Sequence, residues 1–202
     1  MESIDEPIDA NEWTRLSHAE FLWELQRYYY NSNGFQAFAG GPNQVPSFIT
    51  SNCWLAHRLM HTLLHMMDDF ALICDREEEI SDDCTVYVVE LGSGTGQLLY
   101  LIVQMYREYC QTQKDRRHPP VHFIWSEASV TAPGEWYRHP QWRSLFNQLT
   151  QQTDSNELDL HPIFMHALQI DVEEMHRYSS WKDIMPSDCP EPSHVFVLGT
   201  YL

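Results

Sequence analysis

The stretch VYVVELGSGTGQLLYLIV, from Val86 to Val103, decides the fold. Its first part is a nearly continuous run of β-branched and aromatic residues, which is typical of a strand covered on both faces. Its last part has helical spacing and continues to Cys110. Three glycines separate the two runs: Gly92, Gly94 and Gly96. The stretch therefore predicts a buried strand, a tight glycine turn and a helix.

The same alternation continues downstream. Strand-like runs recur in VHFIWS (121–126), HPIFMHALQID (161–171) and SHVFVLGTYL (193–202). Helical patterns lie between them in HPQWRSLFNQLTQQ (139–152), where Pro140 falls near the first turn, and in VEEMHRYSSWKDIM (172–185). Alternating strands and helices predict an α/β fold with a parallel, doubly wound sheet of the Rossmann-like type, of which the first four strands are present.

Two helices are predicted before this sheet. The first lies in SHAEFLWELQRYYY (17–30), where Ser17 and Glu20 have the spacing of a capping box. The second lies in ITSNCWLAHRLMHTLLHMMDDFALI (49–73), where a cap residue precedes apolar residues on most of the circumference, which predicts a well-buried helix. The candidate caps are Thr50, Ser51 and Asn52. The predicted regions are a frayed terminus at 1–16, helices at 17–80 and the sheet domain at 81–202.

Composition narrows the class of protein. The 202 residues are 43% hydrophobic, enough for one ordinary core. Twelve Lys and Arg against 29 Asp and Glu give a net charge of −17, which disfavours a nucleic-acid partner. The five cysteines form no C-x-x-C pair, and no apolar run reaches the roughly 20 residues of a membrane span. We expect a cytoplasmic protein with reduced thiols and no membrane partner.

Histidines on the second helix have the spacing of metal ligands, but we expect no metal there. His57, His61 and His65 stand four apart, with Asp69 after them. Three such residues span more than two turns and cannot easily reach one ion.

The glycine spacing excludes a P-loop and disfavours a dinucleotide-binding loop. A P-loop needs G-x-x-x-x-G-K-[ST], whereas Gln97 and Leu98 follow Gly96. A dinucleotide loop has G-x-G-x-x-G, whereas this chain has G-x-G-x-G. Glu90, two residues before the first glycine, would repel a pyrophosphate but attract a cation. S-adenosylmethionine carries a sulfonium and an ammonium group and no phosphate, so it suits this loop better.

Two further carboxylates follow later strands. Glu127 ends the second strand, where a carboxylate accepts hydrogen bonds from ribose hydroxyls. Asp171 ends the third strand, where it can meet an adenine amino group. Carboxylates after three successive strands, beside a glycine loop, favour an adenosyl cofactor.

VVELGSGTGQLLYLIV resembles the first motif of the class I S-adenosylmethionine-dependent methyltransferases. VPSFITSN, WYRHPQW and VFVLGTYL resemble a less characterised group of that superfamily. The resemblance implies a lid formed by the helix from Ser51. It assigns the turn and the methionine part of the cofactor to Glu90, Gly92, Gly94 and Gly96, the ribose to Glu127, and adenine to Asp171 and Val172. It places the methyl group and the acceptor beside Gly199, Thr200 and Tyr201.

One departure from the family leaves the activity open. The family completes a seven-stranded sheet, whereas this sequence ends at Leu202, after the fourth strand. The expected function is therefore methyl transfer by a longer enzyme of which this is a piece, to a protein or small-molecule acceptor. The alternatives are a noncatalytic methyltransferase-like binding or assembly module and an NAD-dependent oxidoreductase. The apolar edge strand VFVLG would also favour self-association. No catalytic residue is predicted, because methyl transfer mainly requires orientation and exclusion of water.

Overall fold

A computed structural model of the chain describes residues 20–38, 45–76, 84–113, 119–129, 132–153, 163–170 and 189–199, together with 180, 183–185 and 187. The N-terminal elements are α1 (Glu20–Asn33), the 3-10 turns η2 (Gly34–Phe38) and η3 (Ser47–Ile49), and α2 (Cys53–Arg76). Next follow β1 (Val86–Leu91), α3 (Gln97–Thr112), β2 (Val121–Glu127), α4 (Ala132–Arg138) and α5 (Pro140–Thr153). The last strands are β3 (Ile163–Gln169) and β4 (His194–Gly199).

The four strands form one parallel sheet in the order β3-β2-β1-β4. β2 and β3 lie on one side of β1 and β4 lies on the other, so the strand order reverses between β1 and β4. Open α/β sheets bind ligands at the carboxyl ends of the two strands beside such a switch point. In register, Glu90 pairs with Trp125 of β2 and Leu91 pairs with Gly199 of β4. The α/β class and the four predicted strands are confirmed, and the arrangement is compatible with a Rossmann-like fold.

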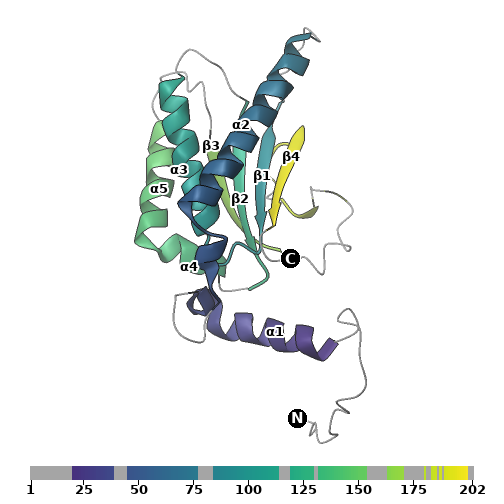
Figure 1. The fold of residues 1–202 in the computed structure, drawn as a ribbon, viewed down its shortest axis with the longest axis vertical. Helices are drawn as coiled ribbons and strands as arrows, with labels where there is room; N and C mark the ends of the chain where they lie inside the picture. Colours follow the sequence, from purple (N-terminus) through teal and green to yellow (C-terminus); the bar gives the residue numbers. More distant parts are fainter. Residues whose placement is uncertain are drawn as a thin grey trace, which may run out of the picture.

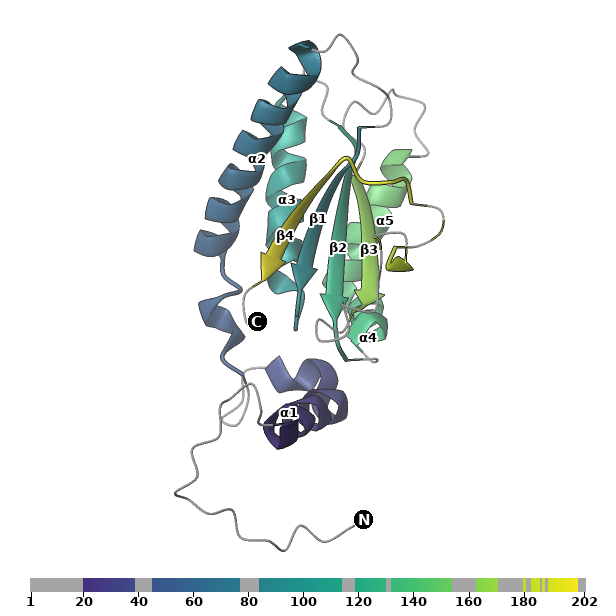
Figure 2. The ribbon, with the colours of Figure 1, turned by 90° about the vertical axis from the view of Figure 1, so that its right-hand side faces the viewer.

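The helices α2, α3 and α5 cover the same face of the sheet (Figures 1 and 2). Successive side chains of β1 point to opposite faces of the sheet. Val86 and Val88 pack into the main core with these helices, whereas Tyr87 and Val89 belong to a smaller cluster on the other face. That smaller cluster also receives Met185 and Cys189 from the segment before β4. All six residues of β1 are buried, as expected for a central parallel strand.

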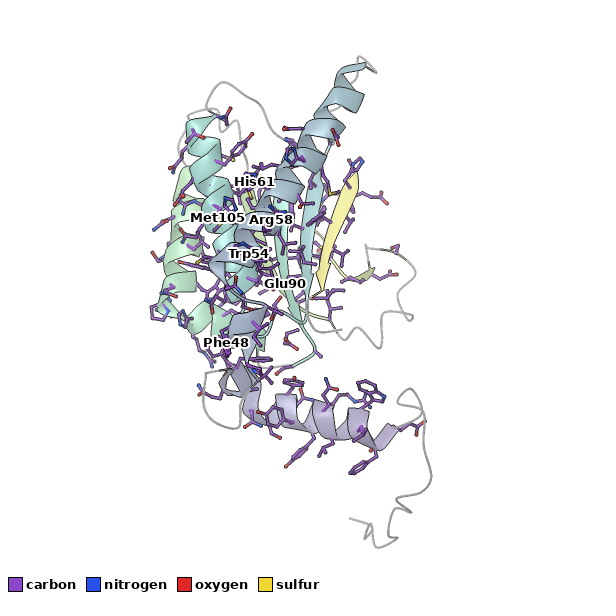
Figure 3. The ribbon with its side chains drawn as sticks, in the orientation of Figure 1. Phe48, Trp54, Arg58, His61, Glu90 and Met105 are labelled. Carbon is purple, nitrogen blue, oxygen red and sulfur yellow. The ribbon has the colours of Figure 1, made fainter. Side chains whose placement is uncertain are left out.

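Helix α2 is less buried than its sequence indicates. Asn52 caps it, because its Oδ1 accepts a hydrogen bond from the Leu55 N–H at 3.0 Å. Its buried residues, Ala56, Met60, Leu63 and Met67, form one stripe that belongs to the main core. Trp54 is 73% exposed, and it lies with Arg58 and His61 along the outer side of the helix (Figure 3). The prediction of a helix buried on most sides is therefore wrong, because a single neighbouring layer covers only one stripe.

Several predicted features lie outside the described residues. These are the frayed terminus at 1–16, most of the helix predicted at 172–185, and the candidate site residues Asp171, Val172, Thr200 and Tyr201. The described residues include a helix that the sequence did not indicate, the short helix α4. Pro133 and Gly134 in its first turn hide the helical pattern.

Candidate cofactor site

The glycine loop, residues 92–96, joins β1 to α3 with three residues in the left-handed region. The φ angles of Gly92, Gly94 and Gly96 are 65°, 53° and 71°. A side chain is strained in this region, so glycine is favoured at all three positions. The loop closes tightly, because the Gly96 N–H donates to the Ser93 carbonyl at 2.7 Å and α3 begins directly afterwards.

The three glycines differ in what lies next to them. A Cβ on Gly96 would lie 2.7 Å from the Trp142 ring and 3.0 Å from the Trp125 ring. A Cβ on Gly94 would lie 3.1 Å from the Phe38 ring of η2. A Cβ on Gly92 would meet nothing within 4 Å. The missing side chains at Gly94 and Gly96 thus leave room for aromatic rings of the protein itself. At Gly92 no other atom lies within 4 Å of the position that a Cβ would take.

Two serines fasten the loop to the end of β2. The Ser93 N–H donates to the Ser126 carbonyl at 2.9 Å, and the Ser126 N–H donates to Ser93 Oγ at 3.2 Å. Both hydroxyls donate to the Glu90 carbonyl, at 3.1 Å from Ser93 and 2.7 Å from Ser126. All these groups are buried, so the loop is held in one conformation before any ligand arrives.

Two indole N–H groups donate hydrogen bonds to carbonyls of the loop. Trp125 Nε1 donates to the Gly96 carbonyl, and Trp136 Nε1 donates to the Gly94 carbonyl, each at 3.1 Å. Both rings are almost fully buried. No local sequence pattern indicates these roles, because the two tryptophans lie 29 and 42 residues from their partners.

Glu90 is a buried carboxyl at the carboxyl end of β1 (Figure 3). It is 1% exposed, and its Oε2 has no hydrogen-bond partner among the described residues. Burial raises the pKa of Glu90 to about 8, against the opposing effects of the Ser93 side chain and the Leu99 backbone N–H. Repulsion from Glu127 adds to the rise. At neutral pH the group is therefore mostly protonated, and a cation placed beside it would favour ionisation.

The carboxylate of Glu127 already accepts hydrogen bonds from backbone N–H groups. Its Oε2 accepts the Gly94 N–H at 2.8 Å, and its Oε1 accepts the Ala128 N–H at 3.0 Å. Burial raises its pKa, and these backbone hydrogen bonds oppose the rise. Each carboxylate oxygen can accept more than one hydrogen bond, so Glu127 can still receive a hydroxyl of a ligand.

A constriction with no room for a water molecule lies against the loop, lined by Tyr30, Gly34, Phe38, Gly94, Glu127 and Ser129. Phe38 covers Gly94 and stacks on Tyr30, with ring centroids 5.5 Å apart. The Phe35 N–H donates to Glu135 Oε2 at 2.7 Å, which ties η2 to α4. Pockets for drug-sized ligands usually measure about 300–1,000 Å³. A ligand of that size would have to displace Phe38.

The segment that lies over the glycine loop, where a lid would be expected, is η2. Helix α1 lies beyond the carboxyl ends of the strands, and η2 follows it over the loop (Figure 2). Helix α2, to which the resemblance gives this role, packs into the main core. Residues 31–48 are rich in Gly, Asn and Pro and predict only a loop, so the sequence does not single out Phe38.

The predicted site residues that the structure describes come from three neighbouring strand ends. Glu90 lies near the carboxyl end of β1, and the three glycines follow that strand. Glu127 ends β2 and interacts with Glu90, and Gly199 ends β4 opposite Leu91. Gly199 is exposed. The arrangement offers a rigid turn, two carboxyl groups and an open backbone at Gly92.

No protein-family model matches the sequence, and no curated protein matches it. Across the described part of the chain, no helix combines the length and the apolar character needed to cross a membrane.

Proposed function

We propose that this chain binds S-adenosylmethionine at the glycine loop and transfers its methyl group to a protein or small-molecule acceptor. The observation that carries the proposal is Glu90, a buried carboxyl whose Oε2 lacks a partner among the described residues, next to the loop. A buried carboxyl without a counter-charge is costly, and a cationic ligand would remove that cost. A pyrophosphate would increase it, which disfavours the oxidoreductase alternative.

Roles for the chain's own residues follow from this proposal. Glu90 would pair with the positive end of the ligand, and Glu127 would accept a ribose hydroxyl while it keeps the Gly94 N–H. The cofactor would supply a carbon already activated by its sulfonium leaving group. The protein would then orient the acceptor and exclude water, which needs no general base for a neutral, basic nucleophile. With a net charge of −17, the chain disfavours a nucleic-acid acceptor. We place this activity in the cytoplasm.

Proton release on binding tests the role of Glu90. With a pKa of about 8, Glu90 is about 90% protonated at pH 7, so pairing with a cation should release about 0.9 proton per ligand bound. Calorimetric titration with S-adenosylmethionine in buffers of different ionisation enthalpy measures this number. Glu90→Gln should abolish the release and weaken binding.

The control is Glu108→Gln, because Glu108 is exposed on α3. It should bind and release protons like the wild type. Binding of S-adenosylmethionine without proton release, or equal affinity in Glu90→Gln, would contradict the assignment of Glu90.

A second prediction concerns Phe38, whose ring covers Gly94. Displacing a partly buried phenylalanine costs about 1–2 kcal/mol, so Phe38→Ala should raise the affinity for S-adenosylmethionine about 5- to 30-fold. Titration of the variant measures the change. Phe48→Ala is the matched control, because Phe48 is 71% exposed on η3. Weaker binding in Phe38→Ala would mean that the ring is part of the ligand site.

The noncatalytic binding module remains the second candidate, and α1 favours it. This helix has no buried residue, and it exposes Phe21, Leu22, Leu25 and Tyr28. Exposed apolar side chains grouped on one helix are typical of an interaction surface. A chain that binds neither S-adenosylmethionine nor S-adenosylhomocysteine would favour this function over methyl transfer.

A further inference from the structure

A second group of polar side chains lies on the sheet face opposite α2, α3 and α5. His122 of β2 and His166 of β3 project from neighbouring strands, two register positions apart, because His166 pairs with Ile124. Cys189 approaches them from the segment before β4. His122 precedes the end of β2 by five residues, or roughly 16 Å of strand, so this group is separate from the glycine loop.

The ligand atoms of the three side chains converge. His122 Nδ1 lies 2.9 Å from His166 Nε2. Cys189 Sγ lies 3.7 Å from His166 Nε2 and 3.9 Å from His166 Nδ1. One ligand atom from each residue falls within 4.8 Å of the others. His122 is buried, and the other two side chains are partly buried.

Aromatic packing holds the histidines in place. The His122 ring stacks on Phe164 at a centroid distance of 4.4 Å and on Tyr87 at 4.7 Å. The Tyr87 hydroxyl donates to the Pro190 carbonyl at 2.7 Å, which fixes the backbone next to Cys189. The cluster is thus preorganised, since strands carry two ligands and a hydrogen bond positions the third.

Two of the three distances between ligand atoms are close to those around a tetrahedral metal ion, and the third is at most 4.8 Å. With metal–nitrogen bonds of about 2.0–2.1 Å and a metal–sulfur bond of about 2.3 Å, tetrahedral geometry puts two nitrogens about 3.3 Å apart and a nitrogen and a sulfur about 3.5 Å apart. The observed nitrogen–sulfur distance of 3.7 Å is close to this value. The two nitrogens, 2.9 Å apart with a proton between them, would separate by a few tenths of an ångström.

We propose that His122, His166 and Cys189 bind one divalent zinc-type cation. Two imidazoles and a thiolate are a borderline-soft ligand set, which favours zinc over magnesium or calcium. On binding, the thiol releases its proton to solvent, and the proton between the imidazoles moves to the other ring nitrogen of its histidine. Water completes the tetrahedron around the three protein ligands. The ion ties the segment before β4 to β2 and β3, so it stabilises the sheet.

Cobalt substitution tests the site. The full chain, purified under reducing conditions and treated with a chelator, is titrated with Co²⁺ without oxygen. One equivalent should produce a thiolate-to-cobalt charge-transfer band and the visible bands of tetrahedral cobalt, and Zn²⁺ should remove both. Cys189→Ser should lose the charge-transfer band, and His166→Asn should lose the tetrahedral bands. Zn²⁺ should raise the Tm of the wild type and leave that of Cys189→Ser unchanged.

Controls come from α2, where His57 Nε2 and His61 Nε2 lie 3.1 Å apart on the surface and Cys53 is exposed one turn earlier. Cys53→Ser and His61→Ala should keep the complete cobalt spectrum. Absence of the charge-transfer band in the wild type, or its persistence in Cys189→Ser, would overturn the proposal. The wild-type titration decides it even if a variant fails to fold.

Discussion

Replacing Glu90 with glutamine should raise the free energy of unfolding by about 4 kcal/mol at pH 8 and change it little below pH 4.5. The pKa of Glu90 is about 8 in the folded chain and 4.5 as a model value. Between these values the unfolded chain ionises Glu90 and the folded chain keeps it protonated, so the wild type loses about 1.4 kcal/mol per pH unit. The variant lacks this contribution of Glu90. Urea unfolding from pH 5 to pH 9 measures both profiles.

Glu108→Gln is the control for this experiment as well. Glu108 is exposed, and its replacement should leave the pH profile of the wild type unchanged. Parallel profiles for the wild type and Glu90→Gln would contradict the burial of Glu90. If the divergence is found, Glu90 costs the free protein stability, as expected for a group whose counter-charge arrives with a ligand.

Replacing Gly96 with alanine should destabilise the chain by about 2–5 kcal/mol. The left-handed backbone costs an alanine about 1–2 kcal/mol, and overpacking adds about 1–3 kcal/mol. Overpacking is expected because the new methyl group would lie 2.7 Å from Trp142, a ring packed in the main core. Urea or thermal unfolding measures the change.

Gly92→Ala is the matched control, because φ is 65° there and no atom lies within 4 Å of the added carbon. It should cost only the backbone strain, about 1–2 kcal/mol. Equal losses in the two variants would show that backbone strain, and not close packing against Trp142, explains the requirement for glycine at position 96.

Much of the fold could be predicted because its signals are local. The run TVYVVE indicated a buried strand, and all six residues of β1 are buried. Pro140 indicated the first turn of a helix, and α5 begins there. Helix α2 shows the limit of such reasoning: its apolar residues indicated burial on most sides, whereas Trp54 is exposed. Composition gives the number of apolar residues, and only tertiary packing decides how many are covered.

The candidate site could be predicted in part for the same reason. The glycines and Glu90 adjoin one strand, so their proximity follows from chain connectivity. The position of Phe38 over Gly94 depends on a contact between residues 56 positions apart, which no local pattern encodes. The cluster of His122, His166 and Cys189 was not predicted, because these residues come from two strands and a later segment with no common spacing. The sequence drew attention to His57 and His61, whose regular spacing reflects the helix.

Calorimetric titration of the wild-type chain with S-adenosylmethionine, S-adenosylhomocysteine and NAD tests the central claim most directly. We expect saturable binding of S-adenosylmethionine, binding of S-adenosylhomocysteine through the shared adenosyl and ammonium groups, and no binding of NAD, whose pyrophosphate would meet Glu90. Binding of NAD, or no binding of either adenosyl ligand, would contradict it.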